Sequence, residues 1–409
     1  MTQNPPSSKE LQARANDVYM QLYPHKDIAF ERADGSYLYD VEGKEYLDCA
    51  AGIAVLSLGH NHPAFKKAIT EQLEKGFTMV TGSYATQPKV KAAELLVDNC
   101  CSDTIFFCNS GTEAVEGSLK LARAWAHTHK AHDAKEFIVF HSSFHGRSYG
   151  AISATEKSLH QPEFAPYLPG FHFATYNDLA SVEALITDKI CAIMVEPVQG
   201  EGGLTAGTPE FFAGLEALCK KHNILLISDE IQAGMGRMGS LFAHAHFNYE
   251  PDIITLAKGL GGGFPVGAFM AKKSVSDSFK AGMHGSTYAG NPLATNVVYH
   301  VVSEIVKPEF LARVKEASAY FIKKLDGLHN ETGNAITAIK GEGLMIGLDT
   351  KFNIKSVLNE LQKSGMLATQ AGKNTLRLTP PLNISNSEID EAVEKIGGVL
   401  KNENKLELL

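Results

Sequence analysis

A lysine and a carboxylate, each placed just after an apolar run, are the residues of this chain best suited to chemistry. Lys258 follows the run that starts at Ile253, and glycines stand at 261–263 behind it. A lysine that is desolvated, or set beside other cations, loses its proton more readily and becomes an amine nucleophile toward an aldehyde. Asp229 follows the apolar run Ile224–Ile227, where a buried carboxylate needs a cationic partner such as a protonated pyridine nitrogen. The alternatives are a surface lysine before a glycine-rich turn and an aspartate that caps a helix.

Ser110, Gly111 and Thr112 form a turn of small residues between the apolar run Ile105–Cys108 and a helical pattern. Backbone N–H groups at a helix N-terminus, with two hydroxyls beside them, make a binding site for a phosphate. The same residues would also suit an ordinary N-cap. A phosphate-binding module of another kind would explain this turn, but it would leave the lysine and the carboxylate without a purpose.

The runs that precede these residues predict strands, and the segments between them predict helices. Runs that are apolar at every position are typical of strands covered on both faces. They are Ile105–Cys108, Phe137–Phe140, Ile190–Val195 and Ile224–Ile227. Helical patterns over Glu113–Ala126 and Pro209–His222 supply the crossovers of a parallel sheet. Ligands bind beyond the carboxyl ends of such strands, which is where the candidate residues fall.

The N-terminal part predicts elements that precede this α/β core. Ser36–Leu47 alternates apolar and polar residues about a turn at Glu42 and Gly43, which predicts a β-hairpin. A helical pattern over 63–76 then leads into the core.

The C-terminal part begins with a long helical pattern that runs from Pro292 through Leu328. Further elements follow within Ala335–Asp349, at Thr375–Leu378 and near Ser387–Leu400. Helices alternating with a few strands predict a separate α+β lobe, completed by the N-terminal segment folding back. The expected parts are an N-terminal segment at 1–63 that joins the small lobe, a large α/β domain at 64–292, and a small α+β domain at 293–409.

The composition is that of an ordinary globular protein large enough for two domains, with 409 residues of which 44% are apolar and 21% charged. The formal net charge is −8 and the sequence has no basic run, so it offers little electrostatic attraction to a nucleic acid. The first residues carry no signal-peptide core, and no apolar stretch reaches the roughly 20 residues that span a bilayer. We therefore expect a cytoplasmic protein with neither a membrane nor a nucleic acid as partner.

Six cysteines and sixteen histidines raise the question of disulfides and metals. The cysteines show neither the two-residue spacing of a zinc-ligand pair nor the density of a disulfide scaffold, so we interpret them as reduced. They are Cys49, Cys100, Cys101, Cys108, Cys191 and Cys219. Histidines form i,i+2 pairs, such as His244 and His246, without a third ligand at metal-motif spacing. A metal site formed in three dimensions stays open as the alternative, but we expect surface or cavity histidines instead.

Further strings of the sequence resemble one protein family. They are YLDCAAGIAV at 46–55, LGHNHP at 58–63, FHGR at 144–147 and LRLTPP at 376–381. With the phosphate turn, the acidic strand end and the lysine in this order, the chain resembles class III, fold-type I pyridoxal-phosphate aminotransferases along nearly its whole length. It is most similar to acetylornithine aminotransferases. The resemblance implies a large domain with a mostly parallel sheet of the seven-stranded type, a smaller α+β lobe built from both termini, and pyridoxal 5'-phosphate as cofactor.

The resemblance assigns contacts to the cofactor phosphate and ring face. Ser110, Gly111 and Thr112 would hold the phosphate, as the helix-terminus argument suggests. Phe144 would stack on the ring, with plain core packing as its alternative. Thr287 would reach the phosphate from a neighbouring subunit, so the resemblance also implies an obligate homodimer with shared active sites.

The resemblance also assigns the polar contacts of the ring and its aldehyde. Asp229 would bind the ring nitrogen, Gln232 would lie on the side of the phenolic oxygen, and Lys258 would carry the cofactor as a Schiff base. Lys258 and Asp229 are therefore the predicted catalytic residues. The family usually has a threonine after that glutamine, whereas this chain has Ala233; none of these cofactor contacts depends on it.

Two arginines are the predicted substrate residues, since a planar guanidinium suits recognition of a carboxylate. Arg147 and Arg377 both lie in the family strings, and a surface salt bridge is the alternative for each. Glu201 resembles the glutamate that pairs with Arg377 while the amino donor is bound, which would let one pocket accept two differently shaped substrates. Ser286, beside the phosphate-binding threonine, is placed in the substrate set as well.

The implied activity is a ping-pong transamination in arginine biosynthesis. N-acetyl-L-ornithine and 2-oxoglutarate would give N-acetylglutamate semialdehyde and glutamate. Relatives that act on ornithine, succinylornithine or 4-aminobutyrate share the cofactor site and stay open as alternatives. A catalytically silent homologue that binds the cofactor is the alternative from another class.

Overall fold

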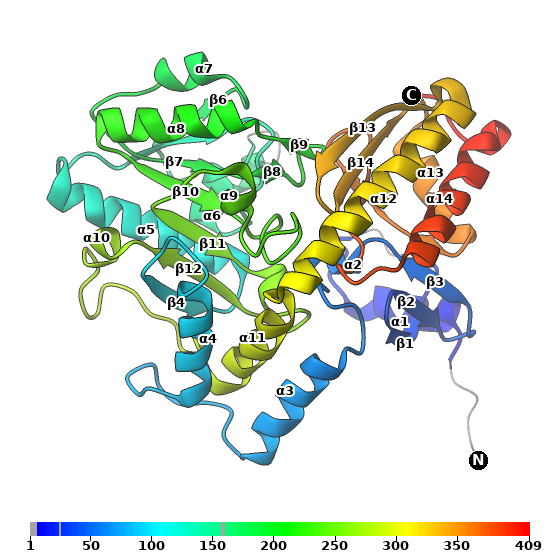
Figure 1. The fold of residues 1–409 in the computed structure, drawn as a ribbon, viewed down its shortest axis with the longest axis horizontal. Helices are drawn as coiled ribbons and strands as arrows, with labels where there is room; N and C mark the ends of the chain where they lie inside the picture. The colour runs from blue at the N-terminus through cyan, green and yellow to red at the C-terminus, as the bar shows by residue number, and fades with distance from the viewer. Residues whose placement is uncertain (1–5, 24–25, 157–159) are drawn as a thin grey trace.

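The computed structural model describes residues 6–23, 26–156 and 160–409. The chain forms a large part around a broad sheet and a small part beside it, and helix α12 (Pro308–Thr332) runs along the small part toward their junction (Figure 1). The N-terminal strands lie next to C-terminal elements in the small part, although they are far apart in the sequence (Figure 1).

The large part is built on a sheet that has seven strands within the described residues, in the order β4-β12-β11-β10-β7-β5-β6. They are β4 (Thr104–Cys108), β12 (Gly267–Ala271), β11 (Ile253–Leu256), β10 (Leu225–Asp229), β7 (Ile190–Val195), β5 (Glu136–Phe140) and β6 (Phe171–Ala174). Strand β12 is antiparallel to both neighbours, and the other adjacent pairs are parallel. The carboxyl ends of β4, β10 and β11 therefore lie at one edge. The predicted mostly parallel α/β sheet is confirmed.

Helices cover both faces of this sheet, which is why its central strands are apolar at successive positions. On β5, Phe137 and Val139 pack in one core cluster with α5 (Gly111–His129), whereas Ile138 packs in another with α8 (Pro209–His222). The smaller elements of the large part are α2 (Ala51–Ala54), α6 (Tyr149–Ala154), α7 (Leu179–Glu183), β8 (Val198–Gln199), β9 (Thr205–Ala206), α9 (Ala243–Phe247) and α10 (Lys273–Ser276).

The long helical pattern of the C-terminal part is two helices rather than one. Helix α11 (Pro292–Ile305) is separated from α12, which begins at Pro308, because a proline donates no backbone N–H and restricts the residue before it. Helix α11 packs with α3 (Pro63–Glu74) and α4 (Gln87–Val97) in a core cluster of the large part. The division at 1–63, 64–292 and 293–409 stays a proposal, and this packing leads us to propose that the small domain proper starts at α12.

The small part is completed by the N-terminal segment, as predicted. The expected hairpin forms β2 (Tyr37–Asp40) and β3 (Glu45–Asp48), and β3 pairs in parallel with β15 (Met366–Leu367) from the C-terminal part. A second sheet has the order β13-β14-β17-β16. The remaining elements are α1 (Ser8–Val18), β1 (Phe30–Asp34), β13 (Ile336–Glu342), β14 (Met345–Thr350), α13 (Ile354–Lys363), β16 (Thr369–Ala371), β17 (Thr375–Leu378) and α14 (Asn386–Lys401). Leu47 and Leu376 share one core cluster, so both ends of the chain bury apolar surface together.

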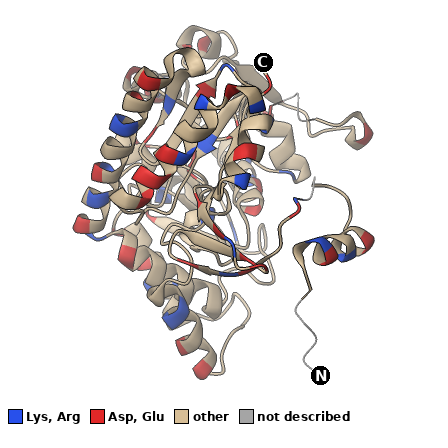
Figure 2. Cartoon of the chain, turned by 90° about the vertical axis from the view of Figure 1, so that its right-hand side faces the viewer, with Lys and Arg blue, Asp and Glu red and all other residues tan. Residues whose placement is uncertain are grey.

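The helices of the described residues are not membrane-spanning, since none combines the length and the apolar character that a bilayer crossing needs. Figure 2 shows acidic and basic residues interspersed along the helices on the side that it presents.

Candidate active site

The carboxyl ends of β4, β10 and β11 border a cavity of about 540 Å³. Most of the predicted cofactor residues line this cavity, together with one predicted substrate arginine. They are Ser110, Gly111, Thr112, Phe144, Arg147, Asp229, Gln232 and Lys258. The segments that carry these residues are far apart in the chain, and the shared sheet edge brings them together.

Lys258 begins a short turn directly after β11, and its backbone adopts φ of +45°. This left-handed conformation is unfavourable for a residue with a Cβ and costs about 1 kcal/mol, so the surrounding fold holds it in place. Burial lowers the pKa of Lys258 to about 8; the negative charge of Glu201 raises it and the positive charge of Arg377 lowers it. An amine with this pKa is partly neutral near neutral pH, which a nucleophile requires.

Asp229 is the last residue of β10, and its buried carboxylate has three hydrogen-bond partners. Oδ2 lies 2.6 Å from Nδ1 of His145, while Oδ1 accepts hydrogen bonds from Thr255 Oγ1 at 2.9 Å and from the backbone N–H of Ile231 at 3.2 Å. Burial by itself lowers the pKa of His145, but its hydrogen bond to Asp229 and the charge of that carboxylate raise it above its usual value. Asp229 thus presents an oriented negative charge to the cavity.

The two carboxylates at the end of β10 point to different surroundings. Glu230 does not line the cavity; it accepts hydrogen bonds from the backbone N–H groups of Ala243 and His244 and lies 2.7 Å from the His244 ring. Successive side chains of an extended strand face opposite ways, which explains the separation. The sequence alone placed both carboxylates at this strand end without distinguishing them.

The predicted phosphate turn serves as an N-cap and a cavity wall at once. Ser110 is the N-cap of α5, and its Oγ accepts a hydrogen bond from the backbone N–H of Glu113 at 3.3 Å. Thr112 Oγ1 lies 2.7 Å from Ser148 Oγ. A Cβ on Gly111 would approach the Ile231 side chain to 3.0 Å, so the absence of a side chain at Gly111 keeps this part of the wall close to the backbone. The N-cap and the anion site are therefore compatible.

Phe144 and Arg147 lie on the solvent side of this cavity. The Phe144 ring is half-buried in the cavity wall, and the guanidinium carbon of Arg147 lies 5.6 Å from its centroid. Arg147 is exposed and also lines an adjoining cavity of about 680 Å³, whose wall includes Glu201 and Lys373. The two cavities share Phe144 and Arg147, so they lie on either side of these two residues.

Arg377, on β17, is buried and held by several acceptors. Its Nη1 donates to Glu201 Oε1 at 2.5 Å, to the carbonyl oxygen of Gly200 at 3.0 Å and to Gln232 Oε1 at 3.3 Å. Its Nε donates to Thr369 Oγ1 at 2.9 Å. With a side chain only 2% exposed, Arg377 does not form the surface salt bridge considered as its alternative. Glu201 is 31% exposed, so it is the more solvent-accessible partner of the pair.

Ser286 and Thr287 do not line the cavity of their own chain. Both are exposed, and Asn109, which does line the cavity, donates from its side-chain nitrogen to Ser286 Oγ at 3.0 Å. The expected contact of Thr287 with the cofactor of a second subunit stays a prediction.

Two further titratable residues line the cavity that the sequence analysis did not single out. One is His145, the partner of Asp229, which stands inside the string FHGR. The other is Glu196, whose carboxylate accepts hydrogen bonds from the backbone N–H groups of Phe144 and Gly200; burial raises the pKa of Glu196 to about 7. Glu196 directly follows the apolar run of β7, so the same rule that selected Asp229 would have found it.

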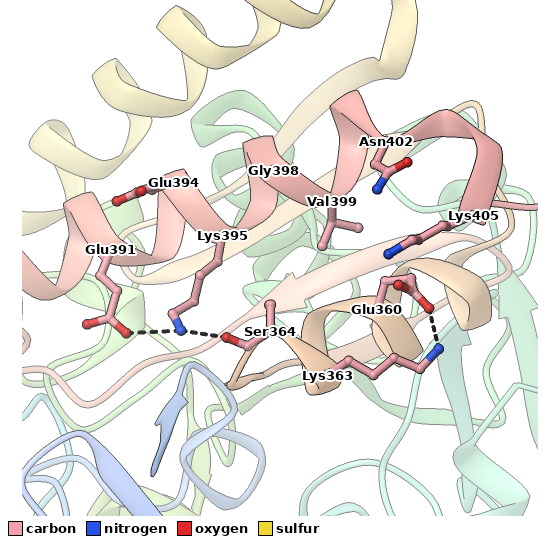
Figure 3. Close-up of a pocket in the computed structure, with 10 residues that line it drawn as sticks. All are labelled: Glu360, Lys363, Ser364, Glu391, Glu394, Lys395, Gly398, Val399, Asn402 and Lys405. Carbon is pink, nitrogen blue, oxygen red and sulfur yellow. Dashed lines mark hydrogen bonds and ion pairs between the residues drawn. The ribbon is translucent and has the colours of Figure 1, made fainter. Parts of the chain in front are cut away.

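A larger cavity of about 690 Å³ lies between α13 and α14 in the small part (Figure 3). Two ion pairs lie in its wall: Lys363 is 2.5 Å from Glu360, and Lys395 is 3.4 Å from Glu391. Surface pairs of this kind contribute little, and none of the predicted site residues lines this cavity. The cavity at the sheet edge is therefore the candidate active site.

The comparisons with known proteins agree with this geometry. Residues 19–400 match the model of the family described as aminotransferase class-III, and the chain belongs to this family. The chain is 43% identical to the acetylornithine aminotransferase of Clostridium acetobutylicum over 375 residues, which are 91% of this chain and 96% of that protein. It is 41% identical to the succinylornithine transaminase of Citrobacter koseri over 380 residues, 92% of this chain and 93% of that one.

Solved structures resemble the whole chain. The ornithine aminotransferase of Toxoplasma gondii has a TM-score of 0.93 at 30% identity, and the match covers 98% of this chain and 96% of that one. The N-acetylornithine aminotransferase of Stenotrophomonas maltophilia has a TM-score of 0.82 at 32% identity, covering 95% and 98%. The predicted fold-type I architecture is thereby confirmed.

The family implies pyridoxal phosphate as the cofactor, and a second structure of the Toxoplasma gondii enzyme has this group in its active site at partial occupancy. The residues of the cavity fit the group. A helix N-terminus suits its phosphate, Phe144 and Ile231 offer apolar faces to its ring, and Asp229 offers a carboxylate to its nitrogen. Lys258 supplies the amine on the same cavity.

Proposed function

We propose that this aminotransferase binds pyridoxal phosphate and transfers the terminal amine of N-acetyl-L-ornithine to 2-oxoglutarate, a step of arginine biosynthesis. The observation that carries the proposal is the meeting of Lys258, Asp229 and the turn at Ser110 in one cavity. The lysine's pKa of about 8 supports its use as a nucleophile and base. A silent homologue that binds the cofactor would keep the same amine, so a turnover assay is needed to separate it from an enzyme.

When bound, pyridoxal phosphate supplies an aldehyde that captures amines and a ring that delocalises negative charge. Ser110 and Thr112 anchor the phosphate at the start of α5. Asp229, oriented by His145, keeps a proton on the ring nitrogen. The Nζ of Lys258 accepts the proton from the substrate carbon that is bonded to nitrogen. The same amine gives the proton back later in the reaction.

Arg377 and Glu201 let one pocket take two substrates in turn. While the donor is bound, Glu201 keeps the charge of Arg377 paired, as in the present structure. A carboxylate of 2-oxoglutarate can replace Glu201 on the guanidinium, because Glu201 lies near the surface and can turn away. We expect Arg147, which lines both cavities, to bind the carboxylate of the donor.

Succinylornithine is a second candidate donor, and Lys373 is the observation that favours it. Its ammonium group is exposed in the adjoining cavity, where a succinyl carboxylate would extend and an acetyl group would bring no charge. An exposed pair of this kind contributes about 0.2–1 kcal/mol, so the preference would be modest.

The test is a panel of donors assayed with 2-oxoglutarate: N-acetylornithine, succinylornithine, ornithine and 4-aminobutyrate. The proposal expects the highest kcat/KM for N-acetylornithine and is abandoned if this compound is not turned over. The variant Lys373→Gln tests the second candidate donor, succinylornithine. Lys189→Gln, at an exposed lysine that lines neither cavity, is its control. A selective loss of succinylornithine turnover in Lys373→Gln favours the second candidate, and equal effects on both donors oppose it.

We also propose that the enzyme is a homodimer whose active sites lie at the subunit contact. Met283 and Tyr288 flank Thr287 and are 49% and 65% exposed, which leaves apolar surface uncovered beside a predicted cofactor ligand. Sedimentation equilibrium of the holoenzyme tests the assembly, and a monomer at micromolar concentration would oppose it.

A further inference from the structure

Three side chains suited to a thiol-binding metal ion meet outside the active-site cavity. Cys100 and Cys101 lie in the turn between α4 and β4, and His244 is on α9. Their ligand atoms, two sulfurs and one ring nitrogen, all lie within 4.8 Å of one another. The cysteines are half-buried and the histidine is buried, so the cluster is shielded but reachable from solvent.

The separation of Cys101 and His244 matches tetrahedral coordination. The distance from Cys101 Sγ to His244 Nε2 is 3.5 Å. An ion with Zn–S bonds of about 2.3 Å and Zn–N bonds of about 2.0 Å at tetrahedral angles needs about 3.5 Å between these two ligand atoms. The pair therefore has the required separation without any change of the backbone.

The other ring nitrogen of His244 is oriented as metal-binding histidines require. Nδ1 lies 2.7 Å from Glu230 Oε1, and this carboxylate is buried and further fixed by the backbone N–H of His244 at 2.9 Å. A carboxylate that accepts a hydrogen bond from Nδ1–H fixes the tautomer whose Nε2 lone pair is free to bind a metal. The lone pair then faces the thiol of Cys101.

We propose that Cys100, Cys101 and His244 bind one zinc ion, with Glu230 supporting the histidine. Thiolate and imidazole ligands select soft or borderline ions such as Zn²⁺. Binding would release the two thiol protons, and the fourth position would fall to a water molecule. Ligand spacing in the sequence favoured surface or cavity histidines over a metal site, because the third member of this set lies far along the sequence from the cysteine pair.

The position of the cluster gives the ion a structural task. Glu230 directly follows Asp229, so the metal-bound histidine would hold the end of β10 from the side opposite to the cavity. A metal that binds the folded chain in preference to the unfolded chain stabilises the fold by mass action. The inference does not depend on which amino donor is used.

The experiment measures zinc on the purified holoenzyme after removal of metal with a chelator and titration with Zn²⁺ alone. We expect about one zinc ion per chain by mass spectrometry of metals. With Co²⁺ in its place, we expect the intense visible bands of tetrahedral cobalt and a thiolate charge-transfer band. In the double variant Cys100→Ser, Cys101→Ser, and in His244→Gln, the affinity should fall at least about tenfold. Cys219→Ser, which changes a buried cysteine on α8 instead, should bind as the wild type does.

Three results would overturn the proposal: no stoichiometric zinc on the wild type, the same zinc content in the cluster variants as in Cys219→Ser, or cobalt spectra without thiolate bands. If the cluster variants fail to fold, the proposal is tested by measurements on the wild type alone. Its melting temperature should fall on chelation and recover with Zn²⁺, and an unchanged melting temperature together with no bound zinc contradicts the site. A reduced thiol–imidazole pair that binds no metal would give this unchanged melting temperature without bound zinc.

Discussion

The Nδ1 atom of His145 lies 2.6 Å from Oδ2 of Asp229, and both side chains are buried. A buried carboxylate is stable only with partners that compensate for lost water, and His145 supplies the strongest of them. The other ring nitrogen, Nε2, has no hydrogen-bond partner among the described residues. The histidine thus acts on the candidate cofactor site through Asp229, as a positioning residue.

Replacing His145 should destabilise the protein and weaken cofactor binding together. His145→Ala leaves a buried carboxylate without its main partner, at a cost of about 3 kcal/mol in the free energy of unfolding, measured by urea denaturation. His145→Gln should restore part of the loss in pyridoxal-phosphate affinity, since its amide can donate to Asp229. The matched control is His172→Ala, which breaks a partly exposed pair with Glu136 and should cost less than about 1 kcal/mol. Equal costs at the two positions would contradict the role of His145.

Lys258→Ala should abolish turnover and the visible absorbance that reports a covalently attached cofactor. Borohydride reduction followed by peptide mass spectrometry should locate the adduct on Lys258 in the wild type. Lys273→Ala, at an exposed lysine paired with Asp277, should retain both properties. Wild-type turnover in Lys258→Ala, or an adduct on another lysine, refutes the assignment.

The capture of pyridoxal phosphate by the apoenzyme should follow the titration of Lys258. Its pKa of about 8 lies below the usual lysine value, so the reactive neutral amine increases as pH rises through about 8. Glu201 raises this pKa and Arg377 lowers it, so Glu201→Gln should shift the rate profile to lower pH and Arg377→Gln to higher pH. Stopped-flow absorbance measures the profiles. A midpoint of about 10.4, the pKa of a free lysine, would show that burial does not lower the pKa of Lys258.

Arg377→Lys should weaken use of 2-oxoglutarate, because an ammonium cannot reproduce the planar fork that binds a carboxylate. Loss of one or more charged hydrogen bonds predicts a fall of about 10- to 100-fold in kcat/KM for the keto acid. Arg313→Lys, on α12 with its side chain against Ile384 and Asn386, serves as control. Unchanged kcat/KM in Arg377→Lys would remove this residue from the substrate site.

Mixed dimers should reveal whether Thr287 acts across the subunit contact. Thr287→Ala should lower cofactor affinity without changing the cavity of its own chain. A dimer of one Thr287→Ala subunit and one Lys258→Ala subunit would contain one site with both an intact lysine and an intact threonine. That mixture should therefore recover part of the activity lost in each variant. No recovery after mixing, with dimers verified by mass, would place Thr287 elsewhere.

Local patterns were sufficient for most of the scaffold and for the residues at strand ends. Runs apolar at every position identified β4, β5, β7 and β10, because strands covered by helices on both faces have no polar side. The residues after those runs, Asp229 and the turn at Ser110, were found for the same reason. The division of the C-terminal helical pattern into α11 and α12 also has a local signal, Pro308, which the sequence analysis did not use.

Pairings between distant residues came only from the tertiary structure. Arg377 meets Glu201, His145 meets Asp229, and Cys100 and Cys101 meet His244, each through elements that no local pattern relates. Periodicity records which face of a strand or helix is buried, whereas a contact depends on how the elements pack in three dimensions. The amino-acid order was enough to predict Lys258 as the reactive lysine, whereas the burial that lowers its pKa depends on the folded chain.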